Sequence, residues 1–357
     1  MNLLAEAFHT DYCICGGGPA ALLCAALLRQ KGADTLIVSP RKFGMLTPVQ
    51  AGGQSVTPTP IFPWLDSTLF TDLLAGALDA PSVLRAHYWE TIAREPERCP
   101  GRGSHAEFLR GFYDDPTRAT ILAEKHLGAA IYVREMPEVR RKVSRHYPAK
   151  SAARQKAGYY DGLSPYYVFL RNAEIGPAVD QAVCRVAPDE SLVTAGTVEI
   201  RYRHLISTIP LWSFLGLAGM ETELRSEAGG AQFVLMTSEE EAEPNLVVYD
   251  CDSGSAVYRV FTPLPRVLVV QVAHAHWKAD VSLTANRVAT LLRLKTAPVV
   301  ERVIEMPGCY PLGVSDEPLK EGLLRSLREK GIVSFGRFAE WRYADLDDLD
   351  WGSLGLM

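Results

Sequence analysis

A glycine-rich turn near the N-terminus constrains the fold of this chain more than any other feature. Residues 11–39 read DYCICGGGPAALLCAALLRQKGADTLIVS. The apolar run that ends at Cys15 predicts a buried parallel strand, and the leucines and alanines after Pro19 recur at helical spacing. Gly32 follows the helix, where a left-handed cap is favoured, and Thr35 to Val38 predicts a second strand. The segment therefore predicts one strand–helix–strand unit.

The turn itself suits the pyrophosphate of a nucleotide. Gly16 permits a tight bend, Gly18 lets the backbone approach a phosphate, and Ala21 keeps the helix close to the sheet. Pro19 is tolerated in the first turn, and the helix N-terminus at Ala20 offers free N–H groups and partial positive charge. We expect a dinucleotide here, with a ligand-free glycine turn as the alternative.

The residue after the second strand departs from the usual dinucleotide pattern. An Asp or Glu normally binds a ribose hydroxyl at this point, but this chain has Ser39, followed by Pro40, Arg41 and Lys42. A serine bonds a hydroxyl more weakly than a carboxylate does. Arg41 and Lys42 suit a 2′-phosphate, which would mean NADP, or they belong to a solvated loop. Ser39 and Arg41 are thus expected cofactor-binding residues, and the identity of the nucleotide stays open at this point.

Composition limits the class of protein. The chain has 357 residues, 47% of them hydrophobic, which is enough for two domains, and its net charge of −5 argues against a general nucleic-acid binder. Its apolar runs are too short for an integral membrane segment, and Met1 to Thr10 lacks signal-peptide features. The seven scattered cysteines predict reduced thiols in a cytoplasmic protein. Cys13 and Cys15 have no second pair at metal-site spacing, so we expect no metal.

The middle of the chain predicts a mixture of helices and strands. Residues 40–63 are typical of a long loop that could wrap a cofactor, and residues 64–127 carry helical stripes. The basic stretch 140–156 is either a solvated helix surface or an anion-binding rim. The tyrosine-rich loop 159–167 could line a polar pocket, form an interface or edge a sheet. Residues 211–220 and 283–294 predict helices, and strands at 233–236, 246–249, 256–261 and 267–272 predict an antiparallel sheet.

A second informative stretch lies at 331–348, which reads GIVSFGRFAEWRYADLDD. It predicts a strand, a turn at Gly336 and Arg337, and a helix that Asp345 would cap. Together with the glycine turn it resembles the UDP-galactopyranose mutase-like and protoporphyrinogen oxidase-like branch of the flavin amine oxidase superfamily. The residues that match the superfamily's C-terminal motif in order and spacing are Gly336, Arg337, Tyr343, Leu346 and Asp347, and Asp345 replaces an Asn. Weaker matches to the same superfamily are residues 206–211, Tyr310 with Pro311, and Tyr258 with Arg259.

This resemblance implies an α/β fold, with a Rossmann-like FAD-binding domain on a parallel sheet and an α+β substrate domain on an antiparallel sheet. The FAD-binding domain would comprise residues 1–75, 175–215 and 328–357, and the substrate domain residues 76–174 and 216–327. By the resemblance the cofactor is FAD. Gly16, Gly18 and Pro19 would hold its pyrophosphate and Arg337 its phosphate–ribityl portion. Residues 345–347 would face the flavin N1–C2 carbonyl edge. For Arg337 the alternative role is an ordinary ion pair within the protein.

Three functions are consistent with these features. The first is an FAD-dependent oxidoreductase that acts on a small polar metabolite by hydride transfer to flavin N5, with Tyr258, Arg259, Tyr310 and Trp341 as substrate-binding candidates. The second is a redox-neutral mutase-like isomerase that uses reduced flavin as a nucleophile. The third is a flavin-fold protein with a decayed site that serves as a partner or scaffold. No catalytic residue is indicated by spacing, the histidines are expected to be structural, and a homodimer stays open.

Overall fold

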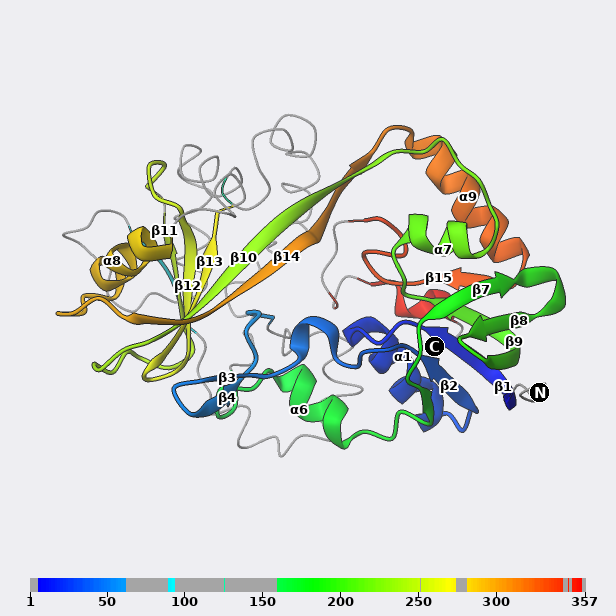
Figure 1. The fold of residues 1–357 in the computed structure, drawn as a ribbon, viewed down its shortest axis with the longest axis horizontal. Helices are drawn as coiled ribbons and strands as arrows, with labels where there is room; N and C mark the ends of the chain where they lie inside the picture. The colour runs from blue at the N-terminus through cyan, green and yellow to red at the C-terminus, as the bar shows by residue number, and fades with distance from the viewer. Residues whose placement is uncertain are drawn as a thin grey trace. The chain divides into compact units, whose positions relative to one another are not determined.

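The chain divides into two compact units, each assembled from separate stretches of sequence (Figure 1). Unit 1 comprises residues 1–47, 166–227 and 311–357, and unit 2 comprises residues 48–165 and 228–310. The computed structural model describes residues 6–61, 89–93, 125, 159–250, 252–273, 281–342, 346 and 349–354. The helical stripes expected within 64–127, the basic stretch 140–156, His146, His274 and His276 therefore lie outside the described residues, apart from 89–93 and 125.

Unit 1 contains a seven-stranded sheet in the order β6-β2-β1-β9-β8-β7, with β15 also paired to β9. The strands are β1 (Glu6–Cys15), β2 (Thr35–Val38), β6 (Ala178–Val179), β7 (Val183–Ala187), β8 (Leu192–Ala195), β9 (Val198–Ser207) and β15 (Ile332–Ser334). β1, β2, β6, β9 and β15 pair in parallel, whereas β7 and β8 pair antiparallel. Cys15 lies beside Ser207 and Ser207 beside Ser334, so the carboxyl ends of β1, β9 and β15 meet at one edge.

The helices of unit 1 complete its core. They are α1 (Pro19–Gln30), α6 (Pro165–Asn172, which begins at the last residue of unit 2), α7 (Leu211–Leu217) and α9 (Glu317–Glu329), with the short 3₁₀ turns η1 (Gly44–Leu46), η4 (Pro188–Glu190) and η7 (Trp351–Leu354). Gly32 follows α1 with φ of 79°, as a left-handed helix end requires. Leu215 of α7 and Leu327 of α9 pack with Leu205 and Ile332 of the sheet in one hydrophobic cluster.

Unit 2 contains a six-stranded sheet in the order β14-β10-β13-β12-β11-β5. The strands are β5 (Trp89–Ala93), β10 (Ser226–Thr237), β11 (Leu246–Asp250), β12 (Val257–Leu264), β13 (Val267–Val272) and β14 (Val299–Val314). The expected antiparallel pairing holds for β10 to β13, and β5 adds in parallel to β11. One face packs Val248, Val260 and Val270 against Ala285 and Val288 of α8 (Val281–Leu292).

Two segments differ from the sequence prediction. The region expected as a long loop contains a hairpin of β3 (Val49–Ala51) and β4 (Gln54–Val56), because Gly52 and Gly53, with φ of 56° and 74°, form its two-residue turn. The tyrosine-rich loop also ends earlier than expected. Pro165, which suits the first position of a helix, starts α6, so Tyr166 and Tyr167 are helical.

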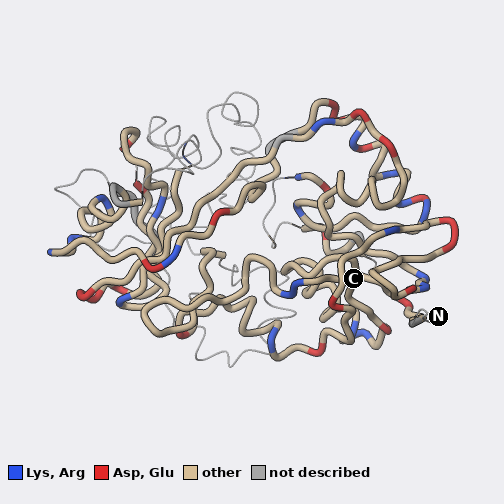
Figure 2. The backbone as a smooth tube through the Cα atoms, in the orientation of Figure 1, with Lys and Arg blue, Asp and Glu red and all other residues tan. Residues whose placement is uncertain are grey.

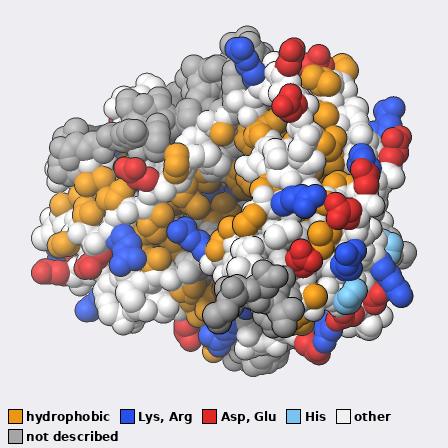
Figure 3. Space-filling model, turned by 45° about the vertical axis from the view of Figure 1, so that its right-hand side comes forward, with side chains coloured by type: hydrophobic (Ala, Val, Ile, Leu, Met, Phe, Trp, Pro, Cys, Tyr) orange, Lys and Arg blue, Asp and Glu red, His pale blue; other side chains and the backbone are white. Residues whose placement is uncertain are grey.

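Acidic and basic residues are interspersed along the backbone of the described part (Figure 2). The face drawn in Figure 3 likewise mixes blue and red groups without a continuous patch of one sign. In the described part of the chain, no helix is both long and apolar enough to cross a membrane.

Candidate functional site

The three consecutive glycines after β1 have different roles. Gly16 has φ of 120°, and a Cβ there would lie 2.1 Å from Oγ1 of Thr208, which follows β9. Thr208 is fixed because its Oγ1 donates to the carbonyl oxygen of Cys15 at 3.2 Å. A Cβ on Gly17 would lie 1.9 Å from the carbonyl oxygen of Arg41. Packing within the protein therefore requires glycine at both positions.

Gly18 is different, because no described part of the protein requires it to be glycine. Its φ of −75° and ψ of 174° are open to any residue, and a Cβ there would meet no described atom within 4 Å. The space beside Gly18 lies at the N-terminus of α1, which has no side-chain cap and no acidic residue in its first turn. Free N–H groups and the helix dipole favour an anion there. The space and its donors fit a pyrophosphate.

The C-terminal Gly-Arg turn meets this helix N-terminus within unit 1. Gly336 has φ of 98°, and a Cβ on it would lie 3.2 Å from the Cβ of Ala20. Gly44 adds a third segment, since a Cβ on it would lie 3.3 Å from the Cα of Gly18. Segments from both ends of the sequence thus surround the glycine turn.

Arg337 links the C-terminal turn to η1. Its Nη2 donates to Sδ of Met45 at 3.7 Å, and its guanidinium carbon lies 5.0 Å from the ring centroid of Phe338. Thioether sulfur is a weak acceptor and an aromatic ring a soft partner, so neither contact neutralises the cation. The half-buried guanidinium thus connects the C-terminal turn to η1.

Ser39 is buried and uses its hydroxyl within its own turn. Its Oγ donates to the carbonyl oxygen of Arg41 at 2.7 Å and accepts from the Arg41 N–H at 3.3 Å. This turn holds the Arg41 carbonyl against Gly17. The Lys42 ammonium lies 3.9 Å from Asp180, and Arg41 is exposed. A ribose at this corner would meet a hydroxyl that is already engaged.

Glu340 was not identified from the sequence. One carboxylate oxygen accepts from the Gly336 N–H at 3.1 Å, and the other lies 3.0 Å from Nη2 of Arg342. Burial raises the pKa of Glu340 above its ordinary value of 4.5, although Arg342 and the Gly336 N–H oppose that shift. The only sequence signal was an acidic residue four positions after a turn glycine.

A second polar cluster lies on the sheet of unit 2. Tyr249, Arg259 and Gln271 are direct neighbours across β11, β12 and β13. Arg259 Nε donates to Gln271 Oε1 at 2.9 Å, Arg259 Nη1 donates to the Tyr249 hydroxyl at 3.3 Å, and Gln271 Nε2 donates to the Tyr310 hydroxyl at 2.8 Å. The guanidinium carbon also lies 5.5 Å from the Tyr258 ring centroid. Three of the four substrate-binding candidates thus lie together, with Tyr249 and Gln271, which the sequence did not identify.

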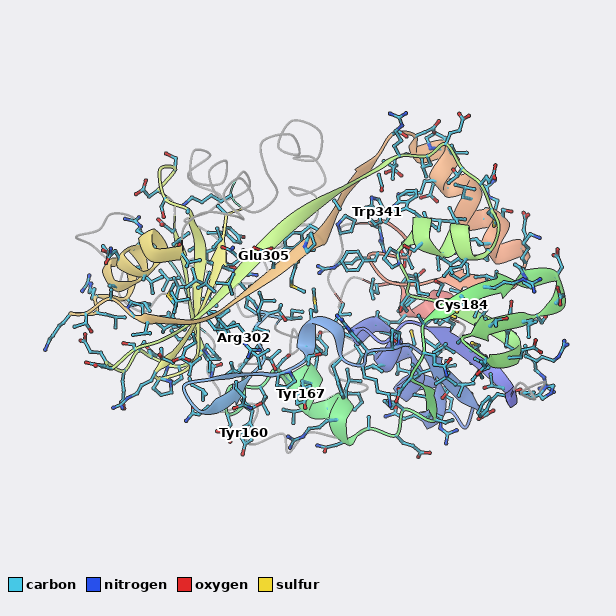
Figure 4. The ribbon with its side chains drawn as sticks, viewed as in Figure 1. Tyr160, Tyr167, Cys184, Arg302, Glu305 and Trp341 are labelled. Carbon is cyan, nitrogen blue, oxygen red and sulfur yellow. The ribbon has the colours of Figure 1, made fainter. Side chains whose placement is uncertain are left out.

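The remaining predicted residues are distributed differently. Trp341, which has φ of 47°, is buried beside α7 (Figure 4). Its ring packs edge-on against Trp212, with 5.1 Å between the ring centroids. Leu346 is described, and its carbonyl oxygen accepts from Trp351 Nε1 at 3.1 Å. Tyr343, Asp345 and Asp347 lie outside the described residues. His204, expected to be structural, stacks on Tyr12.

The cysteines of the described part lie mostly in the core, and none of them forms a disulfide. Burial raises the pKa of the Cys24 thiol, and the neighbouring Cys15 thiol together with burial raises that of Cys13. Raised pKa values make these thiols unreactive. Among the described residues, no cluster of histidine, cysteine and acidic side chains could hold a metal ion.

Comparison with known proteins identifies the fold. The chain is similar to the crystal structure of reduced UDP-galactopyranose mutase, with a TM-score of 0.65 and 14% identity over 94% of this chain and 91% of that one. It is similar to a CLA-producing fatty acid isomerase from P. acnes, with a TM-score of 0.64 and 14% identity over 97% of both chains. It is also similar to a putative protoporphyrinogen oxidase from Exiguobacterium sp. 255-15, with a TM-score of 0.56 and 11% identity over 94% of both chains. The chain has the fold that these mutase, isomerase and oxidase structures share.

No protein-family model and no curated protein sequence matches this chain. The fold is therefore recognised through three-dimensional structure. Within that fold, Gly18, Ala20 and Gly336 are brought together in unit 1, whereas Arg259 and Tyr310 belong to unit 2.

Proposed function

We propose that this chain is an FAD-dependent oxidoreductase that acts on a small polar metabolite by hydride transfer to flavin N5. The open space at Gly18 supports the proposal most directly, because a glycine that the described residues do not require stands where a pyrophosphate would lie. The similarity to a mutase, an isomerase and a putative oxidase with one fold supports a flavin enzyme.

The residues that would hold FAD come from three segments of unit 1. Gly16, Gly18, Pro19 and Ala20 would bind the pyrophosphate through the turn and the helix N-terminus. Ser39 and Arg41 would lie at the adenosine ribose. Gly336 and Arg337 would contact the phosphate–ribityl portion, and Tyr343, Asp345, Leu346 and Asp347 would lie along the flavin. Two of these residues are cations, which suits a ligand with two phosphates.

The chain's contribution to the reaction would be binding and orientation. Bound FAD would supply the hydride acceptor, and the protein would hold the donor carbon in place by contacts to other parts of the metabolite. Tyr258, Arg259 and Tyr310 would make such contacts in unit 2. Trp341 would act indirectly, because it is buried against Trp212.

The decisive experiment is to identify the small molecule that heat denaturation releases from the purified protein. FAD, recognised by its absorbance spectrum and mass, is the expected result. A colourless protein that takes up no added FAD would favour the scaffold alternative. Turnover that consumes an electron acceptor in proportion to product is expected for the oxidoreductase. Activity that requires prior reduction and leaves the substrate's oxidation level unchanged would instead indicate the mutase-like isomerase.

A further inference from the structure

Arg259 is a fixed cation whose contacts leave most of its hydrogen-bonding capacity unused. A guanidinium has five N–H donors, and Arg259 uses one on Gln271 and one on Tyr249. Among the described residues, no carboxylate lies within ion-pair distance of it, and its Nη2 donates to no side chain or backbone oxygen. The side chain is half-buried, so part of it remains accessible to a small molecule.

The neighbours of Arg259 hold the guanidinium in one orientation. Gln271 is buried, its oxygen accepts from Arg259 Nε, and its amide nitrogen donates to the Tyr310 hydroxyl, which fixes the amide. The rings of Tyr249 and Tyr258 lie 5.8 Å and 5.5 Å from the guanidinium carbon. Burial opposes the charged form, but the phenol groups of Tyr249, Tyr258 and Tyr310 outweigh it and raise the pKa of Arg259. The positive charge is thus permanent and positioned before any ligand arrives.

Other inward cations of the described part of unit 2 are already neutralised. Arg287 binds Asp250 through two hydrogen bonds of 2.8 Å and 2.7 Å, and the Lys125 ammonium lies 3.8 Å from the same carboxylate. Arg259 has no such counter-ion in the part of the chain that the structure describes. An unpaired charge in a partly desolvated place is unfavourable unless a ligand provides the opposite charge.

We propose that Arg259 binds the carboxylate of a monoanionic substrate, with Gln271 and Tyr249 as the residues that position it. A guanidinium fork matches the two oxygens of one carboxylate, whereas a diphosphate needs further cations. The tyrosine rings around the fork suit a planar or apolar group next to the carboxylate. This inference rests on the proposed function, because it names the substrate class of that enzyme.

The test uses the full chain with benzoate as the probe and benzamide as its uncharged counterpart. Binding is measured by calorimetry and by the shift in thermal unfolding midpoint, at ionic strength held constant with sodium chloride. Benzoate should bind saturably and at least tenfold more tightly than benzamide. Arg259→Gln should weaken benzoate binding at least tenfold. Arg259→Lys, which keeps the charge but loses the guanidinium fork, should weaken it severalfold. Arg302→Gln, at an exposed position on β14, is the matched control and should bind as the parent does (Figure 4).

Two readouts separate this proposal from its alternatives. If Arg259 only stabilises the sheet, Arg259→Gln should lower the unfolding midpoint without ligand; a ligand-binding role leaves that midpoint unchanged or higher. Equal affinity for benzoate and benzamide, unchanged benzoate affinity in Arg259→Gln, or tighter binding of UDP than of benzoate would overturn the proposal. FAD content is measured in each variant by heat release. If the protein binds benzoate but contains no FAD, the proposed enzyme is refuted and the carboxylate site at Arg259 stands. If it contains FAD but does not bind benzoate, the carboxylate site is refuted and the proposed enzyme stands.

Discussion

Gly18 offers the sharpest test of where a cofactor binds, because its replacement should separate binding from folding. A methyl group at this position meets no described atom within 4 Å, and the backbone conformation is open to alanine and valine. Gly18→Ala should leave the free energy of unfolding unchanged or raise it by about 0.4–1 kcal/mol, since alanine reduces the entropy of the unfolded chain. The same methyl group would occupy the place proposed for the FAD pyrophosphate.

The expected loss of affinity follows from the energy of overpacking. Inserting a carbon into a filled contact costs about 1–3 kcal/mol, and about 1.4 kcal/mol is a tenfold change in affinity. Gly18→Ala should therefore weaken FAD binding by roughly five- to hundredfold, and Gly18→Val should weaken it by more. Fluorescence titration of the cofactor-free protein with FAD measures this, alongside urea unfolding of the same samples.

Neighbouring glycines supply the controls. Gly17→Ala would place its Cβ 1.9 Å from the Arg41 carbonyl oxygen, so this variant should lose stability, by about 2 kcal/mol or more. Gly322→Ala in α9 meets no described atom within 4 Å and should gain about 0.5–1 kcal/mol as a helix-interior glycine, with FAD affinity unchanged. Full FAD affinity in Gly18→Val would refute the placement of the pyrophosphate, and a destabilised Gly18→Ala would refute the claim that the space is open.

Three further predictions concern Ser39, Glu340 and Asp250. Ser39→Ala should lower the free energy of unfolding by about 0.5–1.5 kcal/mol, because it removes the hydrogen bonds to Arg41 that hold the turn; unchanged stability in urea unfolding would contradict this role of the hydroxyl. Glu340 has a raised pKa in the folded protein, so the unfolded chain loses this proton first and stability falls as pH rises above 4.5 through the folded pKa. Glu340→Gln should reduce this fall in urea unfolding, and an identical pH profile would contradict it. Asp250→Asn should lower the free energy of unfolding by about 3–5 kcal/mol, because it leaves buried cations without their carboxylate; a loss under about 1 kcal/mol would contradict this, with Asp252→Asn as the exposed control.

Local patterns in the sequence predicted most of the described secondary structure. The strand–helix–strand unit, α7, α8 and the antiparallel strands β10 to β13 follow from hydrophobic periodicity and from glycine at the turns. The hairpin at residues 49–56 was missed because the prolines around it outweighed the Gly52–Gly53 turn signal. β15 was expected, but its pairing with β9 depends on contacts between residues that are more than a hundred positions apart.

Site residues are harder to predict, because cross-strand register determines them. Arg259 and Tyr310 were candidates through a resemblance to a family, but Gln271 gave no signal. It is one polar residue in an otherwise apolar strand, and its importance arises only because β13 places it opposite Arg259. Glu340 is similar, since its role depends on the Gly336 N–H that its carboxylate reaches. Such residues become visible only when strand pairing and turn geometry are known.

The glycine turn illustrates how a short motif combines folding and binding. Two of its glycines accommodate the protein's own atoms, Thr208 Oγ1 and the Arg41 carbonyl oxygen, while the third leaves space that no described atom fills. The Ser39 hydroxyl, held by Arg41, stabilises the same turn and is therefore less available to a ribose. A chain under selection only to fold would need Gly16 and Gly17 but could carry any residue that fits an extended backbone at Gly18. A third glycine at a helix N-terminus without a side-chain cap is what the proposed pyrophosphate site requires, because a phosphate there must approach the backbone closely.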